Sequence, residues 1–250
     1  MKNFSIILST IAVILAAVAL FSVCKCNGRA PIVAPSIKGG ISQEQLASML
    51  SENPKIIADA LKAYEQYQRE AEEKAAAELL AQNADKLNSE ANVPFVGPKD
   101  AKVTVVEFFD FSCGYCKMLA PEIEKLVANN PDIKFVFKPV TFLGPNSVYM
   151  AKAAMAAKNQ GKFLEMYKAL MGDEGRPNEA QTDEYAKKIG LDMDKYKADL
   201  NSEEVANALK DVTEFSQKIR VNGVPSLFIN AKQTHGRSVD ELQNSINAAK

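Results

Sequence analysis

The sequence is poor in histidine and cysteine. His235 is its one histidine, and its four cysteines form two pairs, Cys24/Cys26 and Cys113/Cys116. The first pair has Cys-x-Cys spacing in a Gly/Pro-rich stretch, which suits zinc poorly, so a structural zinc site is disfavoured and no cofactor is expected. We interpret Cys24 and Cys26 as incidental cysteines of a disordered tail, or as residues at a membrane edge if an anchor precedes them. His235 is expected at the surface.

The sequence also lacks an excess of either charge. Its 30 Lys and Arg residues nearly balance 31 Asp and Glu residues, which leaves a net charge of -1, and no dense basic patch is present. This balance gives no support to nucleic-acid binding. Because 47% of the 250 residues are hydrophobic and 24% are charged, the chain can bury a core and is not disordered overall.

Residues 1–23 are predicted to be a targeting segment. Lys2 precedes an apolar run over residues 6–23, and Ala17-Val18-Ala19 fits the small-x-small pattern that signal peptidase requires. The alternative is an uncleaved membrane anchor, because a bilayer is spanned by roughly 20 apolar residues. In either case the remainder is exported, which in a bacterium means the periplasm, an oxidising compartment.

A linker and a helical region are predicted to follow. Residues 24–40 are rich in Gly and Pro and form the linker. Residues 41–92 are predicted to be a helical oligomerisation region. In it, Ser42-Gln43-Glu44-Gln45 is a capping-box pattern that opens a short helix. Asn53-Pro54 resembles an N-cap and first helical residue, and predicts a second helix from Pro54 to about Leu87.

An apolar stripe runs along the second helix. Leu50, Ile57, Tyr64 and Ala71 recur every seven residues, and the pattern fades after Ala71. The stripe either packs on the chain's own catalytic domain or mediates self-association. A helix this long, ahead of a complete domain, has little intrachain surface to cover. We therefore favour a homodimer or homotrimer.

Residues 93–250 are predicted to form one α/β domain. The expected order is a strand at 103–109, a helix at 114–129, a strand at 133–139, a helical insertion at about 146–219, a strand at 226–230 and a helix at 239–248. Residues 92–100 are predicted to be a connector. Sheet, helical insertion, sheet and helix is the order of a thioredoxin fold with an inserted helical subdomain.

The motif that carries the chemistry is Cys113-Gly114-Tyr115-Cys116, directly after an apolar strand. This order predicts that Cys113 lies at a helix N-terminus, where unpaired N–H groups and the helix dipole favour a thiolate. Cys116, one turn later, can resolve a mixed disulfide formed by Cys113. Gly114 permits a tight turn, and Tyr115 can modulate the sulfurs without the positive charge of a histidine. The predicted chemistry is thiol–disulfide exchange with a client protein, and metal binding or a structural disulfide is the less favoured alternative.

A second motif, Gly223-Val224-Pro225-Ser226, precedes the last predicted strand. A cis peptide bond at Pro225 would place this segment against the cysteine pair. The backbone groups of Val224 would then be available to pair with a client strand.

Three further charged residues lie near these motifs. Glu107 is on the strand that enters the site. If it points inward, it is a buried carboxylate that can move protons to or from Cys116, but strand alternation leaves the solvent-facing orientation equally open. Lys117 and Lys138 are expected to be solvated side chains.

These residues resemble the DsbA-like branch of the thioredoxin superfamily. The resemblance covers about residues 93–250 and rests on Glu107-Phe108-Phe109, the Cys-Gly-Tyr-Cys motif, Val224-Pro225 and Gln160-Gly161-Lys162-Phe163. Residues 41–92 resemble the oligomerisation region of ScsC-like and Com1-like proteins. The resemblance implies a periplasmic thiol–disulfide oxidoreductase with Pro225 as its cis-proline. Members with such an extension form dimers or trimers and often show isomerase activity.

The resemblance leaves the direction of exchange open. The typical DsbA oxidase has Cys-Pro-His-Cys, whereas Gly114-Tyr115 is similar to the dipeptide of DsbC-type isomerases, and Val224 again resembles DsbA. We expect an oligomeric isomerase or reductase that acts on unfolded or misoxidised exported proteins and is kept reduced by a membrane partner resembling DsbD. The alternative is a dithiol oxidase with a DsbB-type partner. A Cu(I)-binding or chaperone module is a third hypothesis, because soft thiolates suit Cu(I).

Overall fold

The computed structural model describes residues 41–250. The predicted targeting segment, the linker, Cys24 and Cys26 lie outside the described residues. Contacts divide the chain into two compact units, with the boundary between Ala63 and Tyr64. Among residues 41–250, none of the helices has both the length and the apolar composition that crossing a bilayer requires.

The first unit contains helix α2 (Gln43–Glu52) and the start of helix α3 (Pro54–Gln82). The predicted capping box is confirmed: the Ser42 hydroxyl accepts from the Gln45 amide at 3.2 Å, and the Gln45 side chain accepts from the Ser42 amide at 3.0 Å. Helix α3 begins at Pro54 as predicted. The side chain of Asn53, however, donates to the Met49 carbonyl and so stabilises the end of α2 rather than the start of α3.

The predicted single helix to Leu87 is wrong, because α3 ends at Gln82 and a short helix α4 (Ala84–Asn88) follows. The side-chain amide of Asn83 donates to the Leu79 carbonyl at 2.8 Å, so a side chain takes the place of a backbone donor at the break. Leu80 and Leu87, on either side of the break, are both buried in one apolar cluster. Their packing on the sheet favours the break over a continuous helix.

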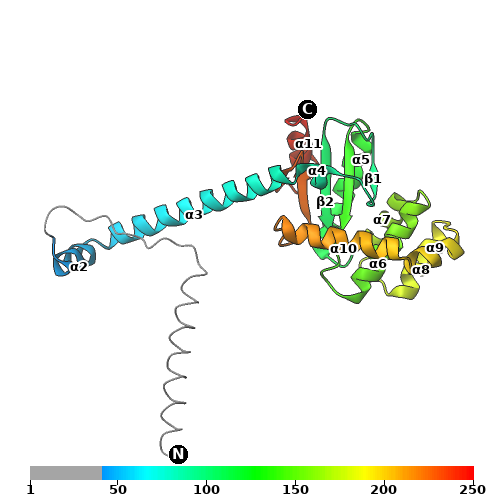
Figure 1. The fold of residues 1–250 in the computed structure, drawn as a ribbon, viewed down its shortest axis with the longest axis horizontal. Coiled ribbons are helices and arrows are strands. Elements are labelled where there is room, and N and C mark those ends of the chain that lie inside the picture. The colour runs from blue at the N-terminus through cyan, green and yellow to red at the C-terminus, as the bar shows by residue number, and fades with distance from the viewer. Residues whose placement is uncertain (1–40) are drawn as a thin grey trace, which may run out of the picture. The chain divides into compact units, whose positions relative to one another are not determined.

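The second unit is built on a five-stranded sheet, in which Figure 1 labels β1 and β2. The strand order is β1-β3-β2-β4-β5. The strands are β1 (Phe95–Val96), β2 (Thr104–Phe109), β3 (Lys134–Pro139), β4 (Ser226–Ile229) and β5 (Lys232–Thr234). Strands β2 and β3 are parallel, and the other neighbouring pairs are antiparallel. The three longer strands confirm the prediction to within about two residues.

The two edge strands were not predicted. Strand β1 lies in the segment expected to be a plain connector and pairs through two residues, Phe95 with Val136 and Val96 with Phe135. Strand β5 forms a hairpin with β4 through Asn230 and Ala231, whose φ angles of 47° and 63° are those of a primed hairpin turn. Such short strands are defined by their partners rather than by a local pattern.

Seven helices accompany the sheet within residues 93–250. They are α5 (Gly114–Asn129), α6 (Pro145–Asn159), α7 (Phe163–Met171), α8 (Glu179–Lys188), α9 (Met193–Leu200), α10 (Glu203–Lys218) and α11 (Val239–Asn247). Helix α5 has the predicted bounds, and the predicted helical insertion is the group α6–α10. Figure 1 shows α6–α9 gathered together beside the sheet. This is the thioredoxin fold with an inserted helical subdomain, as predicted.

The strands alternate between two apolar clusters, one on each face of the sheet. On one face, Val105, Phe109, Phe135 and Phe137 pack with residues of α5, α7 and α11. On the other face, Val106, Phe108, Val136 and Phe228 pack with residues of α3, α4 and α10. Because both faces are covered, every residue of β2 and β3 is buried.

Candidate active site

Cys113 is the N-cap residue of α5, immediately after the turn that leaves β2. Its sulfur accepts a hydrogen bond from the Cys116 amide at 3.4 Å, and the residue is 7% exposed. Its own amide donates to the Asp110 carbonyl at 2.9 Å. Cys113 thus lies at a helix N-terminus, as predicted, with a backbone N–H and the positive end of the helix dipole directed at its sulfur.

Asp110 shapes the turn that presents Cys113, a role that the sequence did not reveal. It is fully buried, and its carboxylate accepts from the Ser112 amide at 2.8 Å and from the Leu143 amide at 3.1 Å. One side chain therefore ties the turn to the loop before α6. A carboxylate two residues before a turn amide is a common turn pattern and could have been recognised.

Cys116 lies one helical turn further on and is buried completely. Both cysteines are free thiols. Burial raises the pKa of the Cys116 thiol well above its ordinary value, and the negative charge of Glu107 raises it further. Cys116 is therefore protonated at neutral pH and needs a base before it can attack.

Glu107 points inward, which resolves the orientation that the sequence left open. It belongs to β2, is 2% exposed, and accepts from the Tyr167 hydroxyl at 3.1 Å through Oε2. Burial raises the pKa of Glu107 to about 8, although the Tyr167 hydrogen bond acts in the opposite direction. A buried carboxylate with this pKa can exchange a proton near neutral pH.

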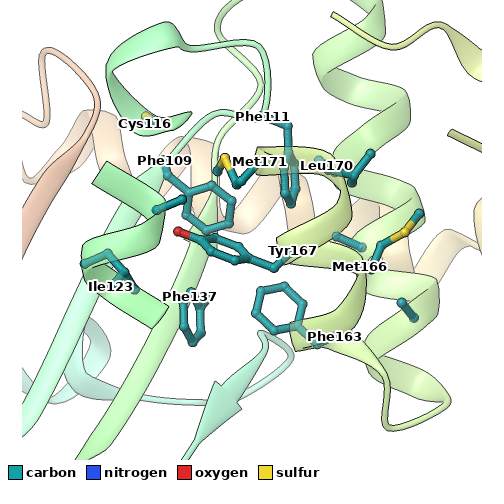
Figure 2. Packing of buried hydrophobic residues seen from close by; sticks show 14 of the residues in the cluster. Phe109, Phe111, Cys116, Ile123, Phe137, Phe163, Met166, Tyr167, Leu170 and Met171 are labelled. Atoms are coloured by element: carbon teal, nitrogen blue, oxygen red, sulfur yellow. The ribbon is translucent and has the colours of Figure 1, made fainter. Parts of the chain in front are cut away.

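Tyr167 holds the Glu107 carboxylate from the helical insertion. Its ring centroid lies 5.3 Å from those of Phe109 and Phe137 and 5.8 Å from that of Phe163 (Figure 2). Rings of three other residues thus fix the hydroxyl in place. The sequence showed Tyr167 only as part of an apolar helix face.

The segment before β4 lies against the reactive sulfur, as predicted. The Val224–Pro225 peptide bond is cis. The Val224 carbonyl accepts from the Cys113 thiol at 3.5 Å. The Ser226 hydroxyl donates to the Gly223 carbonyl at 2.7 Å and closes the turn.

Gly114 and Tyr115, between the two cysteines, form the outer surface of the site. A Cβ at Gly114 would meet no atom within 4 Å, and its φ is not in the left-handed region, so the turn does not require a glycine there. The expectation that Gly114 serves the turn is corrected on this point, because Asp110 makes the turn. Tyr115 is 69% exposed. Both residues leave accessible surface next to Cys113.

Lys117 is not the solvated side chain that we expected. Its ammonium donates to the carbonyls of Leu170 at 3.1 Å, Asp173 at 2.6 Å and Gly175 at 2.8 Å. Partial burial lowers its pKa. Lys117 therefore ties α5 to the loop after α7.

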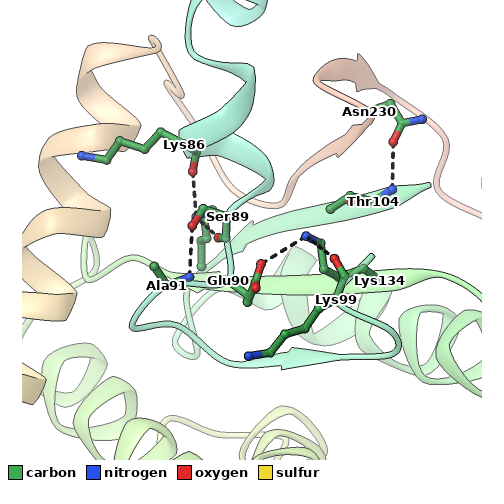
Figure 3. Close-up of polar contacts among 9 residues, drawn as sticks. Lys86, Ser89, Glu90, Ala91, Lys99, Thr104, Lys134 and Asn230 are labelled. Atoms are coloured by element: carbon green, nitrogen blue, oxygen red, sulfur yellow. Dashed lines mark hydrogen bonds and ion pairs between the residues drawn. The ribbon is translucent and has the colours of Figure 1, made fainter. Parts of the chain in front are cut away.

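Lys138 is also buried rather than solvated. Its ammonium, on the face of β3 opposite to the active site, donates to the carbonyls of Lys86 at 3.4 Å and Ser89 at 3.1 Å. Burial lowers its pKa to about 8. Figure 3 shows a related contact on the same strand, where Lys134 reaches the Glu90 carboxylate and the Lys99 carbonyl. Sequence pattern could not show these acceptors, because most are backbone carbonyls of another segment.

Two remaining expectations concern histidine and metals. His235 is exposed, as predicted. Among residues 41–250, no group of three or more His, Cys, Asp or Glu residues is placed to hold a metal ion. The site brings together two thiols, a cis-proline segment and two buried carboxylates, those of Glu107 and Asp110.

Comparisons with known proteins agree with this geometry. The family model described as a DSBA-like thioredoxin domain matches residues 104–247. A thioredoxin-like oxidoreductase from Silicibacter pomeroyi DSS-3 is 34% identical with a TM-score of 0.61, over 66% of this chain and 96% of that one. The catalytic domain of Proteus mirabilis ScsC is 27% identical with a TM-score of 0.62, over 69% of this chain and 97% of that one.

Other relatives differ in how much of their length is matched. BcfH of Salmonella enterica Typhimurium is 27% identical with a TM-score of 0.68, and the match covers 82% of this chain and 93% of that one. A Na(+)/H(+) antiporter NhaA of Salinispora arenicola is 31% identical over 156 residues. The chain spans 24% of the length of that curated relative, so the match concerns one part of a longer protein.

Proposed function

The chain belongs to the DSBA-like thioredoxin domain family, and we propose that it is an oligomeric disulfide isomerase or reductase that acts on exported proteins. The observation that carries the proposal is the position of the Cys113 sulfur. This sulfur accepts a hydrogen bond from the Cys116 amide at the start of α5 and lies 3.5 Å from the Val224 carbonyl beside the cis-proline. A reactive sulfur next to an accessible backbone segment suits a polypeptide substrate.

In the proposed reaction, the Cys113 thiolate attacks one sulfur of a client disulfide. A Cys113–client disulfide forms, and the other client sulfur leaves as a thiolate that takes a proton from water. If that client thiolate attacks a different client disulfide, and the last client thiolate formed displaces Cys113, the client is isomerised and the protein returns to its dithiol form.

If rearrangement stalls, Cys116 resolves the complex. Its sulfur attacks Cys113, the client sulfur leaves as the thiol, and the Cys113–Cys116 pair becomes a disulfide. Because the pKa of Cys116 is raised, its proton must be removed as it attacks, and Glu107 is the buried carboxylate available to accept it. Tyr167 is a positioning residue that holds this carboxylate through a hydrogen bond.

Self-association is proposed from the apolar side chains of α2 and α3. Eight large apolar residues between residues 41 and 67 are exposed: Ile41, Leu46, Met49, Ile56, Ile57, Leu61, Tyr64 and Tyr67. Monomeric proteins rarely expose so many apolar side chains along one segment. Leu80 and Leu87, by contrast, are buried with the sheet. The surface proposed for dimer or trimer formation is therefore the earlier part of residues 41–92.

The proposed location is the periplasm, with residues 1–23 as signal peptide or inner-membrane anchor. In this compartment an isomerase needs a membrane partner resembling DsbD to keep Cys113 reduced. A DsbA-like dithiol oxidase, served by a DsbB-type partner, is the second candidate, and Val224 before the cis-proline favours it. The two candidates differ in the resting state of the cysteine pair, and about 30 mV of potential corresponds to ~1.4 kcal/mol for this couple.

The proposal is tested by recovery of a client with scrambled disulfides. The chain is compared with a variant carrying Ile57→Glu and Tyr64→Glu, which places two charges on the exposed stripe, and light scattering reports the oligomeric state. The oligomeric isomerase is supported if the chain reshuffles client disulfides, whereas the variant is monomeric and only oxidises client dithiols or reduces client disulfides. If both oxidise dithiols and neither reshuffles, the chain is an oxidase. Cys113→Ser is expected to abolish exchange in every assay.

A further inference from the structure

A groove of about 780 Å³ opens directly beside the cysteine pair. One wall is the exposed face of α5, where Tyr115 is 69% and Met118 is 75% exposed. The two residues are three apart on the helix and therefore share a face. Pro121, one turn further on, extends this apolar wall, and Met171 at the end of α7 is a buried part of the lining. An apolar surface thus begins within the Cys-Gly-Tyr-Cys motif itself.

Three acidic residues, Glu124, Asp173 and Glu174, line the same groove. The Asp173 carboxylate accepts from the Gly175 amide and the Tyr185 hydroxyl, each at 2.6 Å, so the carboxylates of Glu124 and Glu174 are the ones open to a ligand. Glu174 is exposed in the loop between α7 and α8. Glu124 contacts the Lys168 ammonium at 3.7 Å, but Lys168 is so exposed that this ion pair neutralises the rim weakly. The rim therefore presents negative charge to a ligand.

The positive charge of the described lining residues is turned away from the ligand. Lys117 contributes to the lining, yet its ammonium donates three hydrogen bonds to carbonyls at the end of α7 and in the loop that follows it. The groove thus combines an exposed apolar wall with an anionic rim. A ligand that complements both features carries a large apolar group and a cation.

We propose that this groove binds the client polypeptide next to its reacting cysteine, and that it selects segments with a bulky apolar side chain followed by Lys or Arg. The inference rests on the proposed function, because it assigns the substrate class of the same site. Gly114 and Tyr115 line the groove and also separate the two cysteines, so a client cysteine bonded to Cys113 leaves its neighbours within reach of Met118. The basic group then meets Glu174.

The test uses peptide mixed disulfides and the reduced protein in a single turnover. Each peptide has one cysteine joined to glutathione, with Phe two residues and Lys four residues away on both sides. In the reaction Cys113 displaces glutathione as its thiol, and Cys116 then releases the peptide thiol and leaves the Cys113–Cys116 disulfide. Two comparison peptides replace Phe by Ser or Lys by Glu. Glutathione disulfide serves as a substrate that has neither feature.

We expect the Phe/Lys peptide to react about tenfold faster than the Ser/Lys peptide, because an aromatic side chain loses contact with water in the groove. We expect it to react about threefold faster than the Phe/Glu peptide, with a difference that shrinks at high salt. Met118→Ser is expected to remove most of the Phe preference, and Glu174→Gln most of the Lys preference. Val148→Ser on α6 and Glu184→Gln on α8 are the matched exposed controls, and both preferences should survive in them.

The outcomes distinguish failure of the groove proposal from failure of the proposed exchange function. If the protein reacts with glutathione disulfide but treats all peptides alike, the groove proposal is overturned and the exchange function stands. If the preferences exist but survive Met118→Ser and Glu174→Gln, selection occurs elsewhere and the proposal is also overturned. If the protein reacts with neither the peptides nor glutathione disulfide, both proposals fail.

Discussion

Two buried ionisable side chains, Glu107 and Lys138, lie on neighbouring strands but on opposite faces of the sheet. In the parallel register of β2 and β3, Glu107 is opposite Phe137, and Phe108 is opposite Lys138. Glu107 faces α5 and α7, where the cysteines are, whereas Lys138 faces α4 and the ring of Phe215. Burial moves the pKa of each to about 8, from opposite directions.

The two residues differ in what surrounds the charge. Glu107 accepts from the Tyr167 hydroxyl and lies close enough to Cys116 to raise the pKa of its thiol. Lys138 instead donates to two backbone carbonyls that belong to α4 and the segment after it. The same burial therefore serves two purposes. On one face it produces a group that can exchange a proton, and on the other it fixes a helix to the sheet.

The largest expected effect comes from Glu107→Gln, which removes the proton acceptor and keeps the shape. Resolution of a Cys113–client disulfide by Cys116 should slow by about 10³-fold, within the usual range for loss of a general base. Quenched-flow trapping of the mixed disulfide measures this rate. The first attack by Cys113 should change much less.

Lys138→Met is the matched control on the other face, and resolution should proceed at the rate of the unaltered protein. Equal slowing in both variants would mean that general loosening of the domain, rather than loss of a base, explains the Glu107 result. Unchanged resolution in Glu107→Gln would exclude Glu107 as the proton acceptor.

The second prediction concerns stability against pH. The folded pKa of Glu107, about 8, is above its ordinary value of 4.5, so the folded state is destabilised as pH rises from 4.5 to 8. The folded pKa of Lys138, about 8, is below its ordinary value of 10.5, so the folded state is destabilised as pH falls from 10.5 to 8. Each slope is about 1.4 kcal/mol per pH unit, and each group costs about 3 kcal/mol at pH 7.

Urea denaturation from pH 5 to 10, in a Cys116→Ala background that removes the titration of this thiol, measures both slopes. Glu107→Gln should abolish the loss of stability between pH 5 and 8 and leave the rise above pH 8. Lys138→Met should do the reverse. If one variant changes both slopes, the two faces of the sheet are not independent.

The third prediction sharpens the assignment of Tyr167. Its hydroxyl stabilises the ionised form of Glu107, so Tyr167→Phe should raise the pKa of Glu107 above 8 and move the pH midpoint of resolution upward by about one unit. At neutral pH the rate should fall by about tenfold. A pH–rate profile distinguishes this shift from a uniform loss of activity.

Tyr196→Phe is the matched control for Tyr167→Phe. Tyr196 is also fully buried in the helical insertion, but its hydroxyl donates to Asp183. This variant should lose stability without any movement of the midpoint. A midpoint that moves equally in both variants would contradict the proposed role of Tyr167.

The sequence predicted those parts of the fold and site that have a local signal. Helix α5 was predicted from its N-terminal cysteine motif and its apolar spacing, and its observed bounds agree. Strands β1 and β5 were missed because two or three residues acquire strand geometry only from a partner distant in sequence. The orientation of Glu107 stayed open because both faces of β2 are buried, so alternation could not distinguish inside from outside.

The remaining errors have one physical cause, which is the identity of the hydrogen-bond partner. Tyr167 lies 60 residues from Glu107, and the sequence showed its ring but not the purpose of its hydroxyl. The sequence predicts solvated side chains for Lys117 and Lys138, because their main acceptors are backbone carbonyls, which every residue possesses. No pattern of side chains reports which carbonyls a fold leaves for a lysine to bind.

The smallest expected effect is local and concerns how Lys138 holds α4. Lys138→Met removes a buried charge but leaves the carbonyls of Lys86 and Ser89 without this donor, at about 1–3 kcal/mol each. The relief and the loss nearly cancel, so global stability at pH 7 should change little, while amide hydrogen exchange in residues 84–88 should quicken by about tenfold. Lys134→Met, which removes the contact with Glu90, should instead loosen residues 90–99. If Lys138→Met leaves amide exchange in α4 unchanged, the contacts of Leu87 alone hold that helix. Lys138 would then not fix α4 to the sheet, and the contrast with the proton-exchanging Glu107 would fail.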